Sequence, residues 1–299
     1  LWAGSMDYHV DVRCSKEIFK QMSQNYLKFR NTARYCLGNL DGFDVNDLVK
    51  PEDMEELDRW AITKLNALIR KAEDAYKDYE FHVVSHLIND FCVVELSSFY
   101  LDIIKDRLYV SKADDPARRS AQTAMYEILN DLIVMISPVL SFTMEEVWQF
   151  MKKPANAPES VQMLPWPEVK EEYLNEELET KFDNFIAIRG EVTKVLEGHR
   201  QNKTIGNSLE AKVVLFAEGE ALDILKSVEK DLPTLLIVSQ VEVNEGAAGG
   251  EEATGRADLK VTVKPADGHK CERCWTYSES VGKNPDHPDL CDRCAAVVG

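Results

Sequence analysis

Apolar residues recur at three- and four-residue intervals through most of the first two thirds of the chain, which is the period of an amphipathic helix. The pattern predicts helices at residues 15–38, from position 51, at 81–109, from 116 to the residue before Pro138, in a short stretch through Met151, and at 171–196. Residues 15–152 are therefore expected to form four long helices and a short one, joined by loops of bundle length.

Local signals mark where three of these helices begin. Pro51 suits a first helical position, and Asp115 precedes Pro116 as a cap before a first turn. Thr143 and Glu146 form a T-x-x-E capping box for the short helix.

The pattern changes in the last third of the chain. Four prolines punctuate residues 154–168 and predict an extended strap. Short runs of β-forming residues predict strands at 211–216, 235–243 and 259–263, with a helix at 222–228 between the first two. Together they predict a small α+β unit, whose Gly-, Ala- and Glu-rich loop at 244–255 we expect to be mobile.

Composition narrows the class of protein. A hydrophobic fraction of 44% over 299 residues excludes a disordered chain. The formal net charge of -17 excludes a protein that coats nucleic acid by bulk positive charge, so any nucleic-acid partner must meet a local basic face. No apolar run approaches the ~18–20 residues of a membrane helix. The start at Leu1 and the absence of a secretory signal suggest a cytosolic fragment of a longer protein.

The strongest chemical signal is a pair of C-x-x-C turns near the end of the chain, Cys271/Cys274 and Cys291/Cys294. Four thiolates form a closed tetrahedral shell, which suits a structural zinc and leaves no open position for a substrate. Too little apolar sequence surrounds them to build a core, so the metal would supply folding energy. Disulfides, iron, or replacement of one cysteine by His269 or His287 remain less favoured alternatives.

The candidates for RNA binding are residues at the first C-x-x-C turn and residues in two basic clusters elsewhere in the chain. Arg273 lies between the two cysteines of the first C-x-x-C turn and Trp275 directly follows it, where the tryptophan could either pack on the metal site or stack on a base. Basic residues outnumber acidic ones by six to two over 11–40, while over 41–60 acidic residues prevail by eight to two. The further candidates are Arg30, Asn31 and Arg34 in the first helix, and Arg200 and Lys203 at the helix-to-strand junction.

Several segments resemble class I aminoacyl-tRNA synthetases of the isoleucyl, valyl and leucyl subgroup. The runs YLKFRNTARYCLGNL (26–40) and LDRWAITKLNALI (57–69) look like signatures of the anticodon-binding helical domain. Residues 79–109, SPVLSFTMEEVW (137–148) and IGNSLEAKVVL (205–215) fit the same subgroup. HKCERCW with the closing CDRC is similar to the C-terminal zinc segment of bacterial-type isoleucyl enzymes, whereas valyl enzymes usually end in a coiled coil.

The resemblance implies a mainly α fold: a helical bundle of the anticodon-binding type, then a small α+β junction unit and a four-cysteine zinc ribbon or knuckle. We expect the end of a catalytic-domain connection at 1–14, the bundle at 15–153, a strap and linking helix at 154–208, the junction domain at 209–266, and the zinc-binding segment at 267–299.

The resemblance also implies the tRNA-recognition part of a ligase that joins isoleucine to tRNA(Ile) with ATP. One structural Zn²⁺ would be bound, and the partners would be the tRNA(Ile) anticodon stem-loop and the remaining catalytic and editing domains. Neither an H-I-G-H nor a K-M-S-K-S motif occurs, so no catalytic residue is assigned and the fragment alone is expected to be an inactive monomer. The alternatives are a zinc-stapled helical scaffold that binds protein, or the equivalent part of a valyl enzyme.

Overall fold

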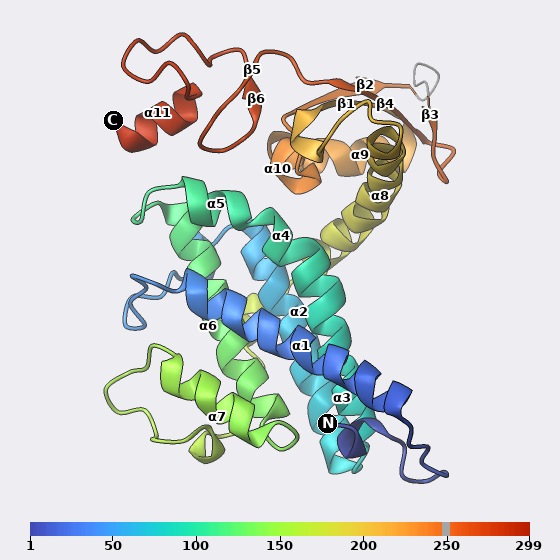
Figure 1. The fold of residues 1–299 in the computed structure, drawn as a ribbon, viewed down its shortest axis with the longest axis vertical. Helices are drawn as coiled ribbons and strands as arrows, with labels where there is room; N and C mark the ends of the chain where they lie inside the picture. Colours follow the sequence, from blue (N-terminus) through green and yellow to red (C-terminus); the bar gives the residue numbers. More distant parts are fainter. Residues whose placement is uncertain (247–251) are drawn as a thin grey trace. The chain divides into compact units, whose positions relative to one another are not determined.

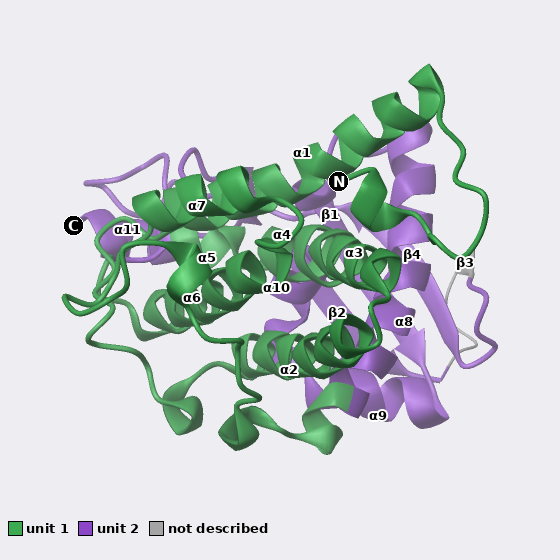
Figure 2. Cartoon of the chain, turned by 90° about the horizontal axis from the view of Figure 1, so that it is seen from below, with its two compact units in different colours: residues 1–108, 113–179 green, residues 109–112, 180–299 purple. Residues whose placement is uncertain are grey.

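The computed structural model describes residues 1–246 and 252–299. The chain divides into two compact units, coloured separately in Figure 2. The first consists of Leu1–Leu108 and Ala113–Glu179, and the second of Tyr109–Lys112 and Thr180–Gly299. We describe each unit by itself.

The first unit is a bundle of helices (Figure 1). Its helices are α1 (Lys16–Asn39), α2 (Glu56–Lys77), α3 (Phe81–Asp90), α4 (Leu101–Ile103), α5 (Lys105–Val110, whose last two residues belong to the second unit), α6 (Pro116–Ile136) and α7 (Ser141–Phe150). The apolar faces that gave the sequence its period meet in a core in which Trp60, Leu65 and Met125 are almost completely buried. The prediction of a helical bundle is therefore confirmed.

Of the three helix starts predicted from local capping and proline signals, the start of α6 was right and those of α2 and α7 were wrong. Asp115 caps α6 by accepting hydrogen bonds from the N–H groups of Ala117 and Arg118. Pro51 begins only a 3₁₀ turn, Pro51–Asp53, and α2 starts at Glu56, because the N–H of Glu55 donates to the Ser120 hydroxyl instead of continuing that turn.

The predicted capping box at Thr143 and Glu146 does not form. Helix α7 already begins at Ser141, so Thr143 lies inside it. Its hydroxyl oxygen is 3.3 Å from the hydroxyl of Tyr26 on α1. The physical reason is that Ser141 donates to the carbonyl of Ser137 and carries the helical turn back toward the end of α6.

The helix predicted over 81–109 contains a change of helical type. Between α3 and α4, residues Phe91–Tyr100 form a π-helix, in which each turn holds more residues than an α-turn. The Tyr100 hydroxyl at its end donates to the carboxylate of Asp58 on α2, at 2.8 Å. A period of three to four residues cannot reveal such a segment, since its buried positions still read as helical.

The first unit ends in an extended strap that contains two 3₁₀ turns, Val161–Met163 and Glu171–Tyr173. The helix predicted at 171–196 is α8, Glu176–Gln201, so it starts later than expected and leads into the second unit.

The second unit contains a four-stranded sheet of β1 (Ala211–Ala217), β2 (Gln240–Glu245), β3 (Glu252–Ala253) and β4 (Leu259–Pro265), in the order β2-β1-β4-β3. Strand β1 pairs in parallel with β2 and antiparallel with β4. Helices α9 (Gly219–Ser227) and α10 (Leu232–Leu236) lie between β1 and β2 along the chain. Part of the loop predicted at 244–255 lies outside the described residues.

The strand predicted at 235–243 was wrong over its first residues and right over its last ones, which form β2. Its apolar first residues belong to α10, whose first turn contains Pro233, and the helix ends at Ile237 in the left-handed conformation (φ 55°). A buried apolar run of this length suits either a strand or a helix, and the proline decides for the helix.

The chain ends in a two-stranded hairpin, β5 (His269–Lys270) with β6 (Tyr277–Ser278), and helix α11 (Asp292–Val298). Hydrogen bonds fasten this segment to the sheet, from the N–H of Tyr277 to the Ser239 hydroxyl (2.7 Å) and from the N–H of Asp267 to the Gln240 side chain (2.9 Å). In the parts of the chain that the structure describes, no helix combines the length and apolarity that crossing a membrane requires.

Candidate metal centre and nucleic-acid interface

The hairpin and α11 bring the two C-x-x-C turns together. Cys271 follows β5 and Cys274 lies in the turn to β6, while Cys291 precedes α11 and Cys294 lies in its first turn. The turn is held by the N–H of Trp275, which donates to the carbonyl of Cys271 at 2.8 Å. The two turns, which have sixteen residues between them in the sequence, thereby meet at one point.

The four sulfur atoms fit a tetrahedral zinc ion. All lie within 4.8 Å of one another, and the Sγ atoms of Cys274 and Cys291 are 3.8 Å apart. A tetrahedron with Zn–S bonds of ~2.3 Å has edges of ~3.8 Å, whereas a disulfide would require ~2.05 Å between sulfurs. All seven cysteines are free thiols. Within residues 1–246 and 252–299, neither His269 nor His287 joins the ligand group.

The electrostatics of the site favour a cation at its centre. Burial opposes ionisation of the Cys271 thiol, yet N–H groups of Cys274, Cys291 and Arg273 donate to it and lower its pKa to about 6. The pKa of Cys291 is raised, because burial and the negative charge of Cys274 oppose a second thiolate. A divalent ion would remove this repulsion, so the donor set fits the group that its spacing predicts.

A glycine directly before β5 allows the two strands of the hairpin to approach each other. Gly268 has φ 87°, and a Cβ at this position would lie 2.3 Å from the carbonyl carbon of Ser278. Only glycine fits where the two strands approach so closely.

Trp275 lies on the surface beside the metal centre. Its side chain is 60% exposed and its backbone adopts φ 65°, a conformation rarely taken by a residue other than glycine. The Nζ of Lys270 lies 5.4 Å from the centre of the Trp275 ring. Sequence reasoning missed Lys270, although a basic residue directly before a C-x-x-C turn was a signal for it.

Arg273 faces the sulfur atoms from within the knuckle. Its Nη1 donates to the Sγ of Cys294 at 3.7 Å, and the side chain is only partly exposed. One guanidinium edge is therefore occupied by the metal centre, whereas the neighbouring Trp275 ring is accessible.

The candidates on α1 are exposed. Arg30, Asn31 and Arg34 all lie on the solvent side of the helix, while the neighbouring Phe29 and Ala33 face the core. Neither arginine takes part in an ion pair among the residues described. Their charge is available to a partner.

The candidates at the end of α8 differ from each other. Arg200 forms an ion pair with Glu197 one turn earlier, with Nε and Oε2 3.2 Å apart. Lys203 is exposed and takes the left-handed conformation (φ 60°) that ends the helix. Part of the basic charge predicted here is therefore already balanced.

Two protein families match this chain. The family described as "Anticodon-binding domain of tRNA ligase" matches residues 58–215, and that described as "Zinc finger found in FPG and IleRS" matches residues 268–297. The second match covers all four clustered cysteines and identifies the metal of this segment as zinc.

Curated relatives are similar over the whole chain. An isoleucine–tRNA ligase of Syntrophotalea carbinolica is 49% identical over 300 residues, which is 100% of this chain and 32% of the relative. The corresponding ligases of Moorella thermoacetica and Desulforamulus reducens are 47% and 48% identical, again over 100% of this chain and over 33% and 32% of their own lengths. The chain thus spans about a third of the length of the curated relatives it matches.

Proposed function

From the premise that this chain belongs to the family of anticodon-binding domains of tRNA ligases, we propose that it is the tRNA-recognition part of an isoleucine–tRNA ligase. The observation that carries the proposal is the order of two family matches in one chain, an anticodon-binding domain followed by a zinc finger of the kind found in FPG and IleRS. The complete enzyme would attach isoleucine to tRNA(Ile) with ATP. This part would bind the anticodon stem-loop and would be inactive alone.

The zinc ligands in this proposal are Cys271, Cys274, Cys291 and Cys294. Because four sulfurs complete the tetrahedral shell, no position remains for a substrate or an activated water, and the ion has a structural role. It would hold the turn between β5 and β6, which contains Trp275, in a fixed arrangement with α11.

The RNA-binding surface in this proposal centres on Trp275. Anticodon bases leave the helical stack in a loop, where an exposed indole can stack on them and a nearby cation can meet a phosphate. Lys270 supplies that cation beside the ring, and Arg273, which donates to the Sγ of Cys294, is partly exposed next to it. The net charge of -17 makes such local basic groups decisive, since the rest of the chain repels RNA.

Two further basic groups complete the proposed set of RNA contacts. Arg30, Asn31 and Arg34 present donors along one exposed face of α1, and Arg200 and Lys203 lie at the end of α8. We also propose that the chain functions in the cytoplasm as a monomer joined to the catalytic and editing domains of the same enzyme.

A titration tests the proposal. Labelled isoleucine tRNA and an unrelated tRNA would each be titrated with the chain at physiological salt, and fluorescence anisotropy would report binding. We expect isoleucine tRNA to bind at least tenfold more tightly, and we expect the preference to disappear when zinc is removed by a chelator and to return when zinc is restored. Equal affinity for both tRNAs would contradict the proposal, and capture of protein without RNA would favour a scaffold.

A further inference from the structure

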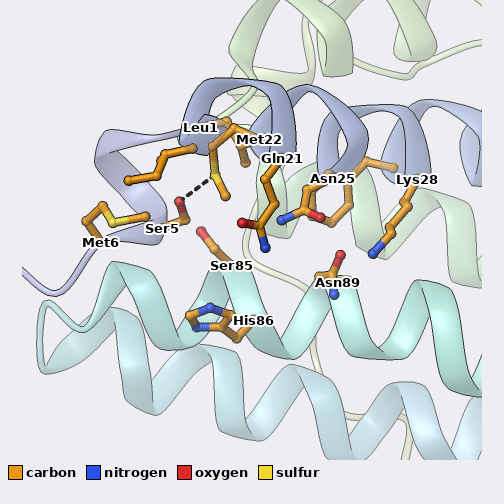
Figure 3. Close-up of a pocket in the computed structure, with 12 residues that line it drawn as sticks. Leu1, Ser5, Met6, Gln21, Met22, Asn25, Lys28, Ser85, His86 and Asn89 are labelled. Atoms are coloured by element: carbon orange, nitrogen blue, oxygen red, sulfur yellow. Dashed lines mark hydrogen bonds between the residues drawn. The ribbon is translucent and has the colours of Figure 1, made fainter. Parts of the chain in front are cut away.

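A cleft in the first unit lies between the N-terminal segment, α1 and α3, apart from the residues proposed above to bind RNA. Its volume is about 340 Å³, which lies within the ~300–1,000 Å³ of small-molecule sites. The polar side chains that line it come from facing helices: Gln21, Asn25 and Lys28 from α1, and Ser85, His86 and Asn89 from α3. Figure 3 shows Gln21 and Lys28 extending from α1 toward α3.

No acidic side chain lines the cleft, although the chain as a whole is strongly acidic. Asp and Glu make up 52 of the 299 residues, yet no carboxylate is among the side chains that line the cleft. Lys28 supplies a positive charge there and forms no ion pair within the described part of the chain. An anionic group is therefore attracted to this position rather than repelled.

Asn89 presents a hydrogen-bond acceptor that lacks a donor. Its Nδ2 donates to the Oδ1 of Asp90 at 3.1 Å, and since a carboxylate only accepts, this contact fixes the orientation of the amide. Its Oδ1 is buried without a hydrogen-bond partner and points toward α1 in Figure 3. A buried acceptor of this kind favours a ligand that brings an O–H or N–H group.

The opposite end of the cleft is apolar. Met6 and Met22 lie there, where Ser5 also approaches the sulfur of Met22 at 3.1 Å (Figure 3). The site thus combines an apolar wall, a set of amide groups and one cation. A nucleotide unit carries groups that match these three parts of the site: the apolar face of its base, the hydroxyl groups of its ribose and an anionic phosphate.

We propose that this cleft binds a ribose-phosphate segment of the tRNA backbone. Lys28 faces the phosphate, and Asn89 accepts a hydrogen bond from a 2′-hydroxyl, the group that distinguishes RNA from DNA. Gln21 and Asn25 supply the remaining amide donors and acceptors. The inference rests on the proposed function, because it assumes that tRNA is the partner, and it adds a second contact that reads the sugar rather than the anticodon.

The first experiment compares two lysines of α1. Lys28→Met removes the charge in the cleft, and Lys20→Met removes an exposed charge from the same helix outside it. Anisotropy titrations of labelled isoleucine tRNA would be made at several salt concentrations. We expect Lys28→Met to weaken binding about tenfold and to reduce the salt slope by about one, and Lys20→Met to change affinity less than about twofold.

The second experiment tests the 2′-hydroxyl. The wild type, Asn89→Ala and Lys28→Met would be titrated with the tRNA transcript and with an all-deoxy version of the same sequence. We expect Asn89→Ala to reduce the ratio of the two affinities about tenfold, whereas Lys28→Met weakens both and leaves the ratio unchanged. Thermal unfolding and zinc content matching the wild type would show that each variant is folded.

Equal effects of Lys28→Met and Lys20→Met, together with an unchanged RNA-to-DNA ratio in Asn89→Ala, would overturn the inference. That result would instead favour a cleft filled by another protein segment. Failure of the proposed function looks different, because the wild type itself would then bind isoleucine tRNA no better than an unrelated tRNA.

Discussion

At the scale of single residues, the exposed ring of Trp275 carries the proposed recognition of bases. The sequence alone left an even choice between packing on the metal and stacking on RNA. A side chain that is 60% exposed, with a lysine above its ring, is placed to meet a partner. No periodicity could reveal this exposure, because Trp275 lies in the short turn between β5 and β6, outside any repeating element.

Replacing Trp275 with alanine should weaken RNA binding by about 1–3 kcal/mol, which is the contribution of one stacked base. Trp275→Phe keeps a ring and should recover most of this loss. Binding would be measured by anisotropy and zinc by atomic absorption. Loss of zinc together with unchanged RNA affinity would assign the residue to the metal site instead.

A second residue-scale prediction concerns the buried carboxylate of Asp58. It is completely buried and accepts two hydrogen bonds of 2.9 Å from the Arg107 guanidinium, in addition to those from Tyr100 and Ser120. Asp58→Asn would leave the arginine charge buried and unbalanced, so we expect the free energy of unfolding to fall by about 3–5 kcal/mol.

The matched control for this pair is Glu73→Gln, which breaks an exposed ion pair with Lys77 on the same helix. It should change the free energy of unfolding by less than about 0.5 kcal/mol. Urea unfolding followed by circular dichroism measures both variants. Similar, small effects would mean that the buried pair adds little to the bundle.

At the scale of elements, helices with a regular apolar stripe were predictable and their junctions were not. α1 and α6 begin within one residue of their predicted starts, because Ser15 and Asp115 cap them. Predicted helix starts were wrong where a tertiary contact replaced the local signal. At the start of α2, for example, the N–H of Glu55 donates to the Ser120 hydroxyl. The metal-binding turns were predictable because ligand spacing is a local property of the chain.

Gly268→Ala tests the element that holds the metal site. The added methyl group would collide with the backbone of Ser278, so we expect the hairpin to open and zinc to be released more readily. Gly282→Ala is the control, since Gly282 has a similar φ of 90° but open space around it and should cost only about 1–2 kcal/mol. A zinc-release assay with a chromogenic chelator compares them. Equal release rates would contradict the steric argument.

At the scale of the whole molecule, the sequence predicted a helical bundle, a small sheet and a metal segment in the correct order. It could not predict the hydrogen bonds that fasten the last segment to the sheet, because these depend on contacts between distant residues. The cleft lined by α1 and α3 was invisible for the same reason.

Zinc removal should disturb one part of the molecule and spare the rest. The bundle has its own apolar core, whereas residues 267–299 have almost none beyond the cysteines. We therefore expect Cys291→Ser to lose zinc and protection from amide hydrogen exchange over 267–299, with most helical circular dichroism retained. Cys14→Ser is the control, because Cys14 is an exposed thiol that is distant in sequence from the four clustered cysteines. This variant should keep one zinc per chain. Unfolding of the bundle in Cys291→Ser would contradict this independence.

An anticodon transplant tests most directly the proposal that this chain reads the anticodon of isoleucine tRNA. An unrelated tRNA carrying the isoleucine anticodon loop would be titrated beside both parent tRNAs, with fluorescence anisotropy as the readout. We predict that the transplant raises the affinity of the unrelated tRNA to within a few-fold of isoleucine tRNA. An affinity that follows the body of the tRNA and ignores its anticodon would contradict the account.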